Sequence, residues 1–111
     1  MRILFIGGAG FIGSSLVKEF LKDSKYEVFV LEPSFANVSR LNGLNVTIIR
    51  ESLTNVEAVE DILADNEIQT VVHLVSTLIP GSGYDDFNRE FQNMIFPSIR
   101  LMEFCAKKNI K

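Results

Sequence analysis

The sequence predicts an α/β protein in which a parallel β-sheet carries helices on both faces. Short apolar runs that are typical of buried strands alternate along the chain with segments of helical periodicity. A cluster of glycines lies between the first apolar run and the first helical segment. Because parallel strands need crossover connections and these are right-handed, four strands are expected in the order 3-2-1-4.

The elements follow from the same patterns. Strands are expected at residues 2–6, 27–32, 45–50 and 69–76, and helices at 11–22, 54–65 and 84–108, with a short helical turn at 35–41. Pro97 interrupts the last helix, because it lacks an N–H and crowds the carbonyl of Asn93 four residues back. We therefore expect a kink near Asn93.

The glycine cluster is the most informative motif of the chain. Gly8, Gly10 and Gly13 fit G-x-G-x-x-G, and Gly7, Gly10 and Gly13 fit the related G-x-x-G-x-x-G. Glycines let phosphates approach the backbone, and the positive end of the following helix favours an anion. This strand–turn–helix context is typical of a Rossmann-like dinucleotide-binding domain, with a pyrophosphate at Gly7, Gly10, Phe11, Ile12 and Gly13.

Glu32 ends the second predicted strand, nineteen residues after Gly13. In dinucleotide folds an acidic residue at roughly 20 residues from the glycines binds the ribose hydroxyls. A carboxylate accepts hydrogen bonds from the 2′-OH and repels a 2′-phosphate, so NAD is expected in preference to NADP. The alternative is that Glu32 only ends a strand at the surface.

Two segments resemble the extended short-chain dehydrogenase/reductases, especially the nucleotide-sugar epimerases and dehydratases. Residues 3–14 resemble the opening of that family, although Ile6 replaces the usual Thr. Residues 70–77 resemble its fourth strand, and Asn93 stands where the family carries an Asn close to the cofactor. The resemblance covers essentially the whole chain.

The same resemblance implies a contact with adenine. Ser52 and Leu53 stand where the family has an Asp and a Leu, so a hydroxyl replaces the carboxylate expected to contact adenine. The topology adds a further segment, since ligands of open α/β sheets bind where the strand order reverses. The loop 77–83 after the fourth strand is therefore expected to face the glycine turn. Residues Leu74, Val75, Ser76 and Thr77 would then pass beside the adenosine and the nicotinamide ribose, unless they form an ordinary connecting loop.

No catalytic residue is assigned. The family's acid–base chemistry depends on a Tyr-x-x-x-Lys pair, whereas Tyr26 is followed four residues later by Val30 and Tyr84 by Asn88. By resemblance the catalytic segment would follow a fifth strand, beyond Lys111. Residues 1–111 are thus expected to be one NAD-binding domain, truncated before the catalytic segment of a longer enzyme that binds the nucleotide sugar. In such an enzyme NAD would accept a hydride from a sugar carbon and return it.

Two other functions stay open from the residues alone: a non-catalytic dinucleotide-binding module or sensor, and a domain that binds nothing. Cofactor titration would separate the last from the others. His73 is the only histidine and Cys105 the only cysteine, so no metal site is expected. His73 lies in an apolar strand and is expected to be a hydrogen-bonded core imidazole.

Composition limits the partners and the compartment. The net charge is −3, the pI is about 5.1 and no basic cluster is present, which disfavours nucleic acid. No apolar run approaches the ~18 residues of a membrane span, and one cysteine suits a reducing cytoplasm. The unguarded apolar strand 70–76 and the apolar helix 84–108 predict self-association.

Overall fold

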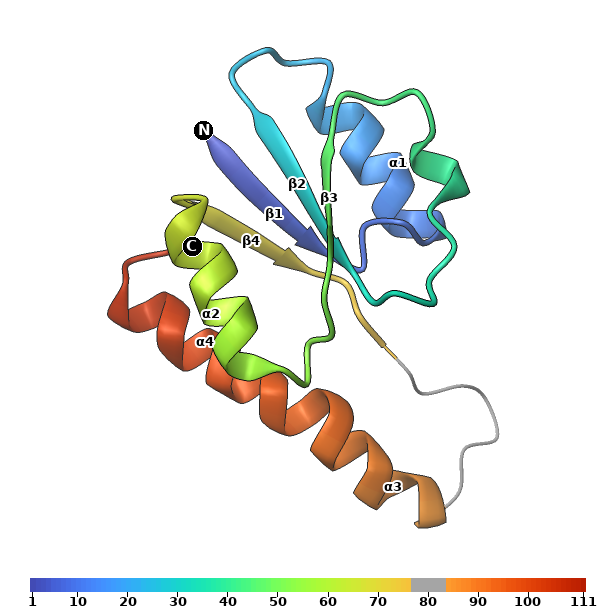
Figure 1. The fold of residues 1–111 in the computed structure, drawn as a ribbon, viewed down its shortest axis with the longest axis vertical. Helices are drawn as coiled ribbons and strands as arrows, with labels where there is room; N and C mark the ends of the chain where they lie inside the picture. The colour runs from blue at the N-terminus through green and yellow to red at the C-terminus, as the bar shows by residue number, and fades with distance from the viewer. Residues whose placement is uncertain (77–83) are drawn as a thin grey trace.

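The computed structural model describes residues 1–76 and 84–111, and its four strands form one parallel sheet in the order β3-β2-β1-β4 (Figure 1). This is the predicted order. The strands are β1 (Arg2–Ile6), β2 (Glu27–Glu32), β3 (Thr47–Arg50) and β4 (Thr70–His73). Helix α1 (Phe11–Phe20) covers one face of the sheet, and α2 (Val56–Asp65) and α4 (Phe96–Lys107) cover the other.

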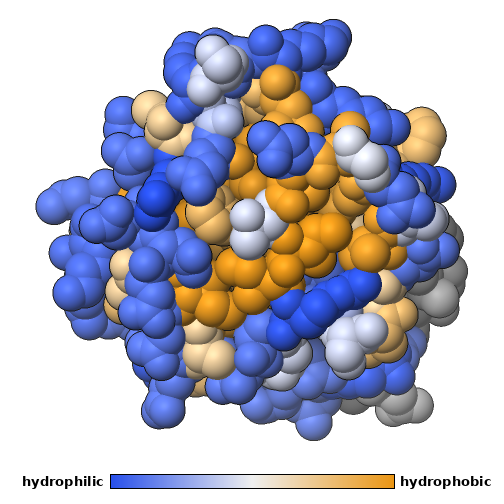
Figure 2. All heavy atoms as spheres, turned by 45° about the horizontal axis from the view of Figure 1, so that its top comes forward, coloured by the Kyte–Doolittle hydropathy of each residue, from blue (hydrophilic) through white to orange (hydrophobic). Residues whose placement is uncertain are grey.

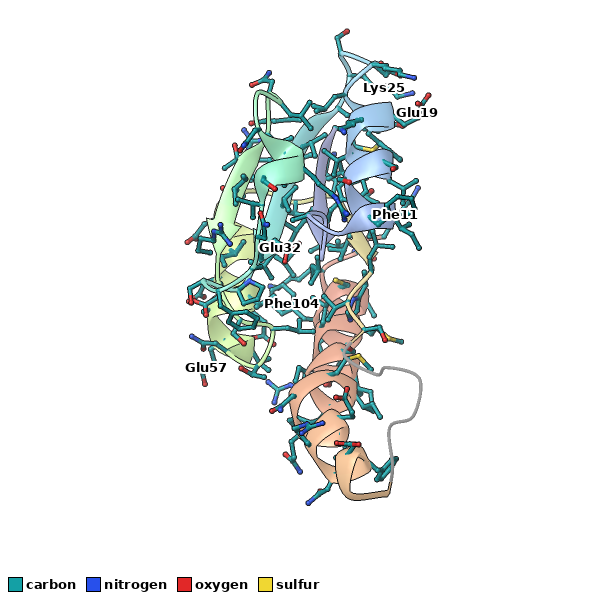
Figure 3. The ribbon with its side chains drawn as sticks, turned by 90° about the vertical axis from the view of Figure 1, so that its right-hand side faces the viewer. Phe11, Glu19, Lys25, Glu32, Glu57 and Phe104 are labelled. Carbon is teal, nitrogen blue, oxygen red and sulfur yellow. The ribbon has the colours of Figure 1, made fainter. Side chains whose placement is uncertain are left out.

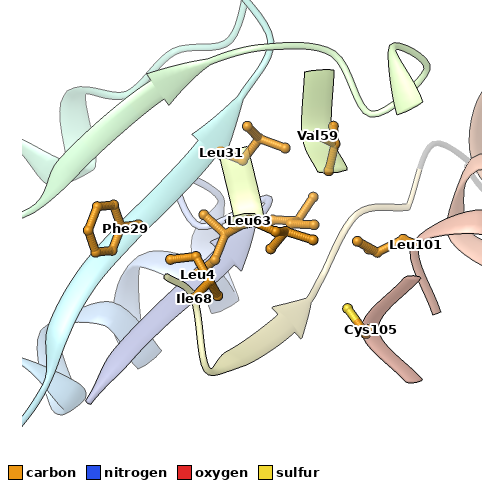
Figure 4. Packing of buried hydrophobic residues seen from close by; sticks show 9 residues of the cluster. Leu4, Phe29, Leu31, Val59, Leu63, Ile68, Leu101 and Cys105 are labelled. Atoms are coloured by element: carbon orange, nitrogen blue, oxygen red, sulfur yellow. The ribbon is translucent and has the colours of Figure 1, made fainter. Parts of the chain in front are cut away.

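The two central strands are buried on both sides, which explains why they read as unbroken apolar runs. On one face Ile3, Phe5 and Val30 pack with Val17 of α1. On the other face the side chains of β1 and β2 pack against α2 and α4 (Figure 4), in a cluster formed by Leu4, Ile6, Phe29, Leu31, Val59, Leu63, Ile68, Leu101 and Cys105. Alternate residues of each strand thus belong to separate halves of the core.

Several predicted boundaries were wrong by a few residues: α1 ends at Phe20 rather than at 22, the short helical turn begins at Ser39 rather than at 35, and β3 begins at Thr47 rather than at 45. Two further differences have local reasons. Helix α2 begins at Val56 rather than at 54, because the Thr54 hydroxyl lies 2.7 Å from the Ser52 hydroxyl instead of capping the helix. Strand β4 ends at His73 rather than at 76. The Leu74 N–H still donates to the Ile6 carbonyl at 2.9 Å, and the chain then leaves the sheet.

The last helical region is divided near Asn93, as the position of Pro97 predicts. Helix α3 (Tyr84–Glu90) passes into a π-helical segment, Phe91–Ile95, which passes into α4. The Phe96 N–H donates to the Phe91 carbonyl, five residues back, and Pro97 lies in the first turn of α4. A proline is tolerated in that turn, so the break takes the form of a π-helical segment. Figure 1 shows α3 projecting beyond the sheet.

The end of the chain returns to the sheet beside β4 (Figure 1). After α4, Asn109 adopts a left-handed conformation with φ 55°, and the Ile110 N–H donates to the Cys105 carbonyl at 2.9 Å. The Lys111 N–H then donates to the Gln69 carbonyl, and the Val71 N–H donates to the Lys111 carbonyl at 2.7 Å. The outer edge of strand 70–76, expected to be open, is therefore covered at its start.

None of the helices within residues 1–76 and 84–111 combines the length and the apolar character needed to cross a membrane.

Candidate functional site

The glycine turn joins β1 to α1 and touches the end of β4. Gly7 has φ +83°, and a Cβ added there would lie 3.1 Å from Val75 Cγ2 and 3.3 Å from the Leu74 carbonyl carbon. A side chain at Gly7 would therefore be strained and crowded. The turn therefore contacts Leu74 and Val75, while the loop 77–83 that was expected to face it lies outside the described residues.

The other three glycines of the turn have different roles. A Cβ at Gly13 would lie 2.5 Å from the Gly7 carbonyl oxygen, and a Cβ at Gly8 would lie 2.9 Å from Phe5 and Val30 atoms of the core. These two glycines serve close packing. Gly10 is extended, with φ −70° and ψ −178°, and a Cβ there would meet only the Gly7 carbonyl, at 3.8 Å. The space in front of Gly10 is thus open.

A cavity of about 320 Å³ occupies that space. It is lined by Gly7, Gly10, Phe11, Ile12, Gly13 and Leu74, so it brings together all five residues predicted to hold a pyrophosphate. Gly10 caps α1 without a side-chain hydrogen bond, and the first turn of the helix carries no acidic residue. Unpaired N–H groups and the helix dipole therefore make this end of the cavity attractive to an anion.

Glu32 is buried at the end of β2, with 7% of its surface exposed. Its Oε1 accepts a hydrogen bond from the Ala9 N–H of the glycine turn at 2.7 Å. Figure 3 shows Glu32 inside the molecule and Phe11, which is 76% exposed, at its surface. Glu32 therefore does not end the strand at the surface, as the alternative supposed, and its binding of a ribose stays a prediction.

A second cavity, of about 380 Å³, lies along the carboxyl ends of the strands. It brings together Ser52, Leu53, Val75 and Asn93, which come from three separate segments of the sequence. Its other lining residues were missed by sequence reasoning: Ile6, Leu31, Pro33, Phe35, Glu51 and Thr54. Their position at or just after predicted strand ends was the available signal. The cavity offers apolar walls with hydroxyl and amide groups, which suits a flat heteroaromatic ring.

Of the predicted residues that the structure describes, Glu32 and Ser76 line neither cavity. Ser76 is exposed beyond the end of β4, and Thr77 lies outside the described residues. A smaller cavity of about 260 Å³ is lined by Ala9 of the turn and by Asn37, Ser39 and Arg40, which follow β2 and were missed by sequence reasoning. The Arg40 guanidinium lies 5.6 Å from the centroid of the Phe11 ring.

Another cavity, of about 410 Å³, lies away from these. It is lined by Glu60, Arg100, Glu103, Phe104 and Lys107 of α2 and α4. Its charged groups pair with one another: Arg100 lies 3.7 Å from Glu60, and Lys107 lies 2.8 Å from Glu103. We interpret it as a solvated helix surface.

His73 and Cys105 have structural surroundings. His73 Nε2 lies 2.7 Å from the Ser98 hydroxyl, its Nδ1 accepts the Val75 N–H at 3.4 Å, and burial lowers the pKa of the imidazole. Cys105 packs in the core, where burial raises the pKa of its thiol. In the described part of the chain no three His, Cys, Asp or Glu residues form a group that could hold a metal ion.

The curated proteins that are similar to this chain include several UDP-glucose 4-epimerases. Among curated proteins, the UDP-glucose 4-epimerase of Bacillus subtilis strain 168 is 30% identical over 118 residues, which cover all of this chain and 34% of that protein. The UDP-glucose 4-epimerase of Caenorhabditis elegans is 28% identical and is matched over 36% of its length. The chain therefore spans about a third of the length of these relatives.

Solved structures give the same result for the fold. The UDP-glucose 4-epimerase of Thermus thermophilus, in complex with NAD, has a TM-score of 0.84 to this chain at 27% identity, covering all of it and 35% of that protein. The enzyme of Thermotoga maritima with UDP-glucose has a TM-score of 0.85 at 30% identity, covering all of this chain and 36% of the enzyme. A model of one family matches residues 3–111. This match, together with the glycine turn and the strand order, shows that the chain belongs to the NAD dependent epimerase/dehydratase family.

Proposed function

We propose that this chain binds NAD and is the cofactor-binding part of an enzyme that acts on nucleotide sugars. The observation that carries the proposal is that residues adjacent in the sequence line two neighbouring cavities at the carboxyl edge of the sheet. Ile6 and Val75 line the 380 Å³ cavity, and their sequence neighbours Gly7 and Leu74 line the 320 Å³ cavity. An extended ligand can therefore run from one to the other without crossing the core.

Each part of a dinucleotide then has a counterpart. The pyrophosphate lies over Gly10 at the start of α1, where the backbone is open and the helix dipole is favourable. Glu32, held by Ala9 through Oε1, accepts from the adenosine ribose through its other oxygen. Adenine lies in the cavity with Ser52 and Leu53.

The nicotinamide half is assigned to the other end of the site. It extends past Leu74 toward Ser76 and Thr77. Asn93 lies on the π-helical segment and lines the same cavity as Ser52 and Leu53, so it is proposed to face the cofactor from that cavity. The assignments of Ser76 and Thr77 rest on the sequence alone.

The chemical step is proposed for a longer enzyme. In it NAD would accept a hydride from a carbon of the nucleotide sugar and return it, as the names of the relatives suggest. We place the sugar site and the acid–base pair outside these 111 residues, because the chain spans about a third of its relatives. A cytoplasmic location is proposed from the single thiol, Cys105, which is free and buried.

Self-association is also proposed, and two surfaces support it. Large apolar side chains are exposed along α3, the π-helical segment and α4: Phe87, Phe91, Phe96, Ile99 and Met102. Strand β4 is an edge of the sheet, and within the described residues the backbone of Lys111 pairs with its outer side at Gln69 and Val71. Figure 2 shows, on the face that it presents, an apolar area with hydrophilic residues around it.

Calorimetric titration with NAD, NADP and adenosine tests the cofactor proposal. We expect saturable binding of NAD, weaker binding of adenosine because it lacks the pyrophosphate, and weaker binding of NADP because of Glu32. Absence of NAD binding by the folded chain at millimolar concentration would refute the proposal.

A further inference from the structure

His73 is the last residue of β4 and its side chain lies between that strand and α4. It belongs to the same side of the sheet as Val71 and Val75, which pack against the core cluster that includes Leu101 and Cys105. The imidazole Nε2 lies 2.7 Å from the Ser98 hydroxyl on α4. His73 thus connects the end of β4 to the helix that follows the π-helical segment.

The other ring nitrogen holds the chain where it leaves the sheet. The Val75 N–H donates to His73 Nδ1 at 3.4 Å. An Nδ1 that accepts a hydrogen bond carries no proton, so the neutral ring has its proton on Nε2 and donates it to Ser98. One imidazole therefore accepts a hydrogen bond from the segment after β4 and donates one to α4.

Val75 is the residue through which this contact reaches the site. It lines the 380 Å³ cavity together with Asn93. Its backbone nitrogen and Cγ2 would lie 3.2 and 3.1 Å from a Cβ on Gly7, so it packs directly against the glycine turn. Ser98, the other partner of His73, follows Asn93 by five residues in the sequence. His73 thus connects the two sides of the cavity.

We infer that His73 is a positioning residue, which keeps the segment after β4 in the conformation that binds the dinucleotide only while its ring is neutral. This inference rests on the proposed binding of NAD. His73 need not touch the ligand, because it acts through the Val75 backbone. When the ring is protonated, Nδ1 becomes a donor, and the Val75 N–H loses its acceptor.

The surroundings of the ring favour the neutral form. Burial lowers the pKa of His73 below its ordinary value, and no charged group of the described residues contributes to that shift. On the neighbouring elements, Ile6 is its register partner on β1, while Arg100 of α4 pairs with Glu60 of α2. Glu90 at the end of α3 is buried and has a partner of its own.

The expected pH dependence follows from these contacts. If NAD binds the form with a neutral ring, its affinity is constant at pH values above the ordinary pKa of histidine. The affinity falls as the pH drops through the pKa of His73, which burial lowers. Loss of one hydrogen bond predicts a fall of roughly two- to tenfold. Because the chain has one histidine, its imidazole resonance can be followed without assignment by mutation.

The test measures NAD affinity by calorimetry at about pH 5 and about pH 8 for the wild type and three variants. His73→Asn places an amide oxygen near the position of Nδ1 and cannot titrate, so its affinity should be close to that of the wild type at high pH and should not change with pH. His73→Leu lacks the acceptor and should bind roughly two- to tenfold more weakly at both pH values. Ser98→Ala keeps Nδ1 and should keep the pH dependence.

The outcomes are distinguishable. An equal loss of affinity at low pH in the wild type and in His73→Asn would overturn the inference, as would wild-type affinity in His73→Leu. Absence of NAD binding at every pH would instead refute the proposed function. In that case the contact between His73 and Val75 can still be tested by NMR. The chemical shift of the Val75 amide should change with pH together with that of the imidazole, and a Val75 shift that does not change as the ring titrates would overturn the inference. Should His73→Leu fail to fold, the wild type and His73→Asn are sufficient.

Discussion

The Glu32 carboxylate accepts the backbone N–H of Ala9 at 2.7 Å, which ties the end of β2 to the glycine turn. The contact joins residues that are twenty-three positions apart, and it is buried. It gives Glu32 a structural task in addition to the one proposed for it at the ribose. Two variants separate these tasks, because the amide of glutamine can keep the hydrogen bond while removing the charge.

Glu32→Gln should keep the fold and weaken the preference for NAD. A carboxylate facing a 2′-phosphate is unfavourable by on the order of several kcal/mol, and the neutral amide removes that repulsion. The affinity for NADP should therefore rise toward that for NAD, as measured by calorimetric titration of both. An unchanged ratio of the two affinities would remove Glu32 from the ribose site.

Glu32→Ala is the matched control for stability. It leaves the buried Ala9 N–H without an acceptor, which costs about 1–3 kcal/mol. Thermal or denaturant unfolding should therefore show Glu32→Ala to be less stable than Glu32→Gln. Equal stability of the two variants would show that the Ala9 contact contributes little.

Gly10→Val should abolish NAD binding in a protein that still folds. The conformation of Gly10 is open to any residue, and a Cβ there meets only the Gly7 carbonyl at 3.8 Å, so the new side chain occupies the space proposed for the phosphates. Circular dichroism checks the fold and calorimetry the binding. Wild-type affinity in the folded variant would contradict the placement of the pyrophosphate.

Gly13→Ala is the contrasting variant. Its Cβ would lie 2.5 Å from the Gly7 carbonyl oxygen and 2.8 Å from Gly8 Cα, so α1 cannot keep its position. Overpacking of this kind costs typically about 1–3 kcal/mol. We expect a lower unfolding midpoint for Gly13→Ala than for Gly10→Val, and the reverse order would be evidence against the assigned roles of these glycines.

The 111-residue chain should show no epimerase, dehydratase or dehydrogenase turnover with nucleotide sugars, even with NAD saturating. Neither Tyr26 nor Tyr84 has a lysine four residues later, and loss of a general base typically reduces rates by about 10²–10⁴-fold. Mass spectrometry of the sugar products is the measurement. Robust turnover would mean that acid–base groups lie within these residues.

Self-association should be visible in sedimentation at increasing protein concentration. Met102 is 65% exposed on α4 in a row of apolar side chains, so Met102→Glu should weaken the association if that helix surface forms the contact. Asn88→Glu adds the same charge at an exposed polar position of α3 and serves as the control. A wild type that stays monomeric throughout the micromolar range would refute the proposal.

Sequence patterns predicted those elements that depend on local properties of the chain, such as an apolar run or a proline. The apolar runs of β1 and β2 are buried on both faces, so a strand there follows from composition alone. Pro97 cannot donate to Asn93, and the helix is interrupted at that point, by a π-helical segment where the sequence predicted a kink. The end of β4 was extended too far, because the apolar run continues to Val75 after the pairing has ended.

What the sequence determined by itself is the order of the strands, the glycine turn between β1 and α1, and the acidic residue that follows at the end of β2. These depend on hydrophobic period, on backbone freedom at glycine and on the handedness of crossovers. Only the tertiary structure decided that Gly8 packs in the core while Gly10 faces open space, that Glu32 binds Ala9, and that His73 connects Val75 to Ser98. Such contacts join segments far apart in the chain, so they depend on strand register and helix packing, which no local pattern specifies.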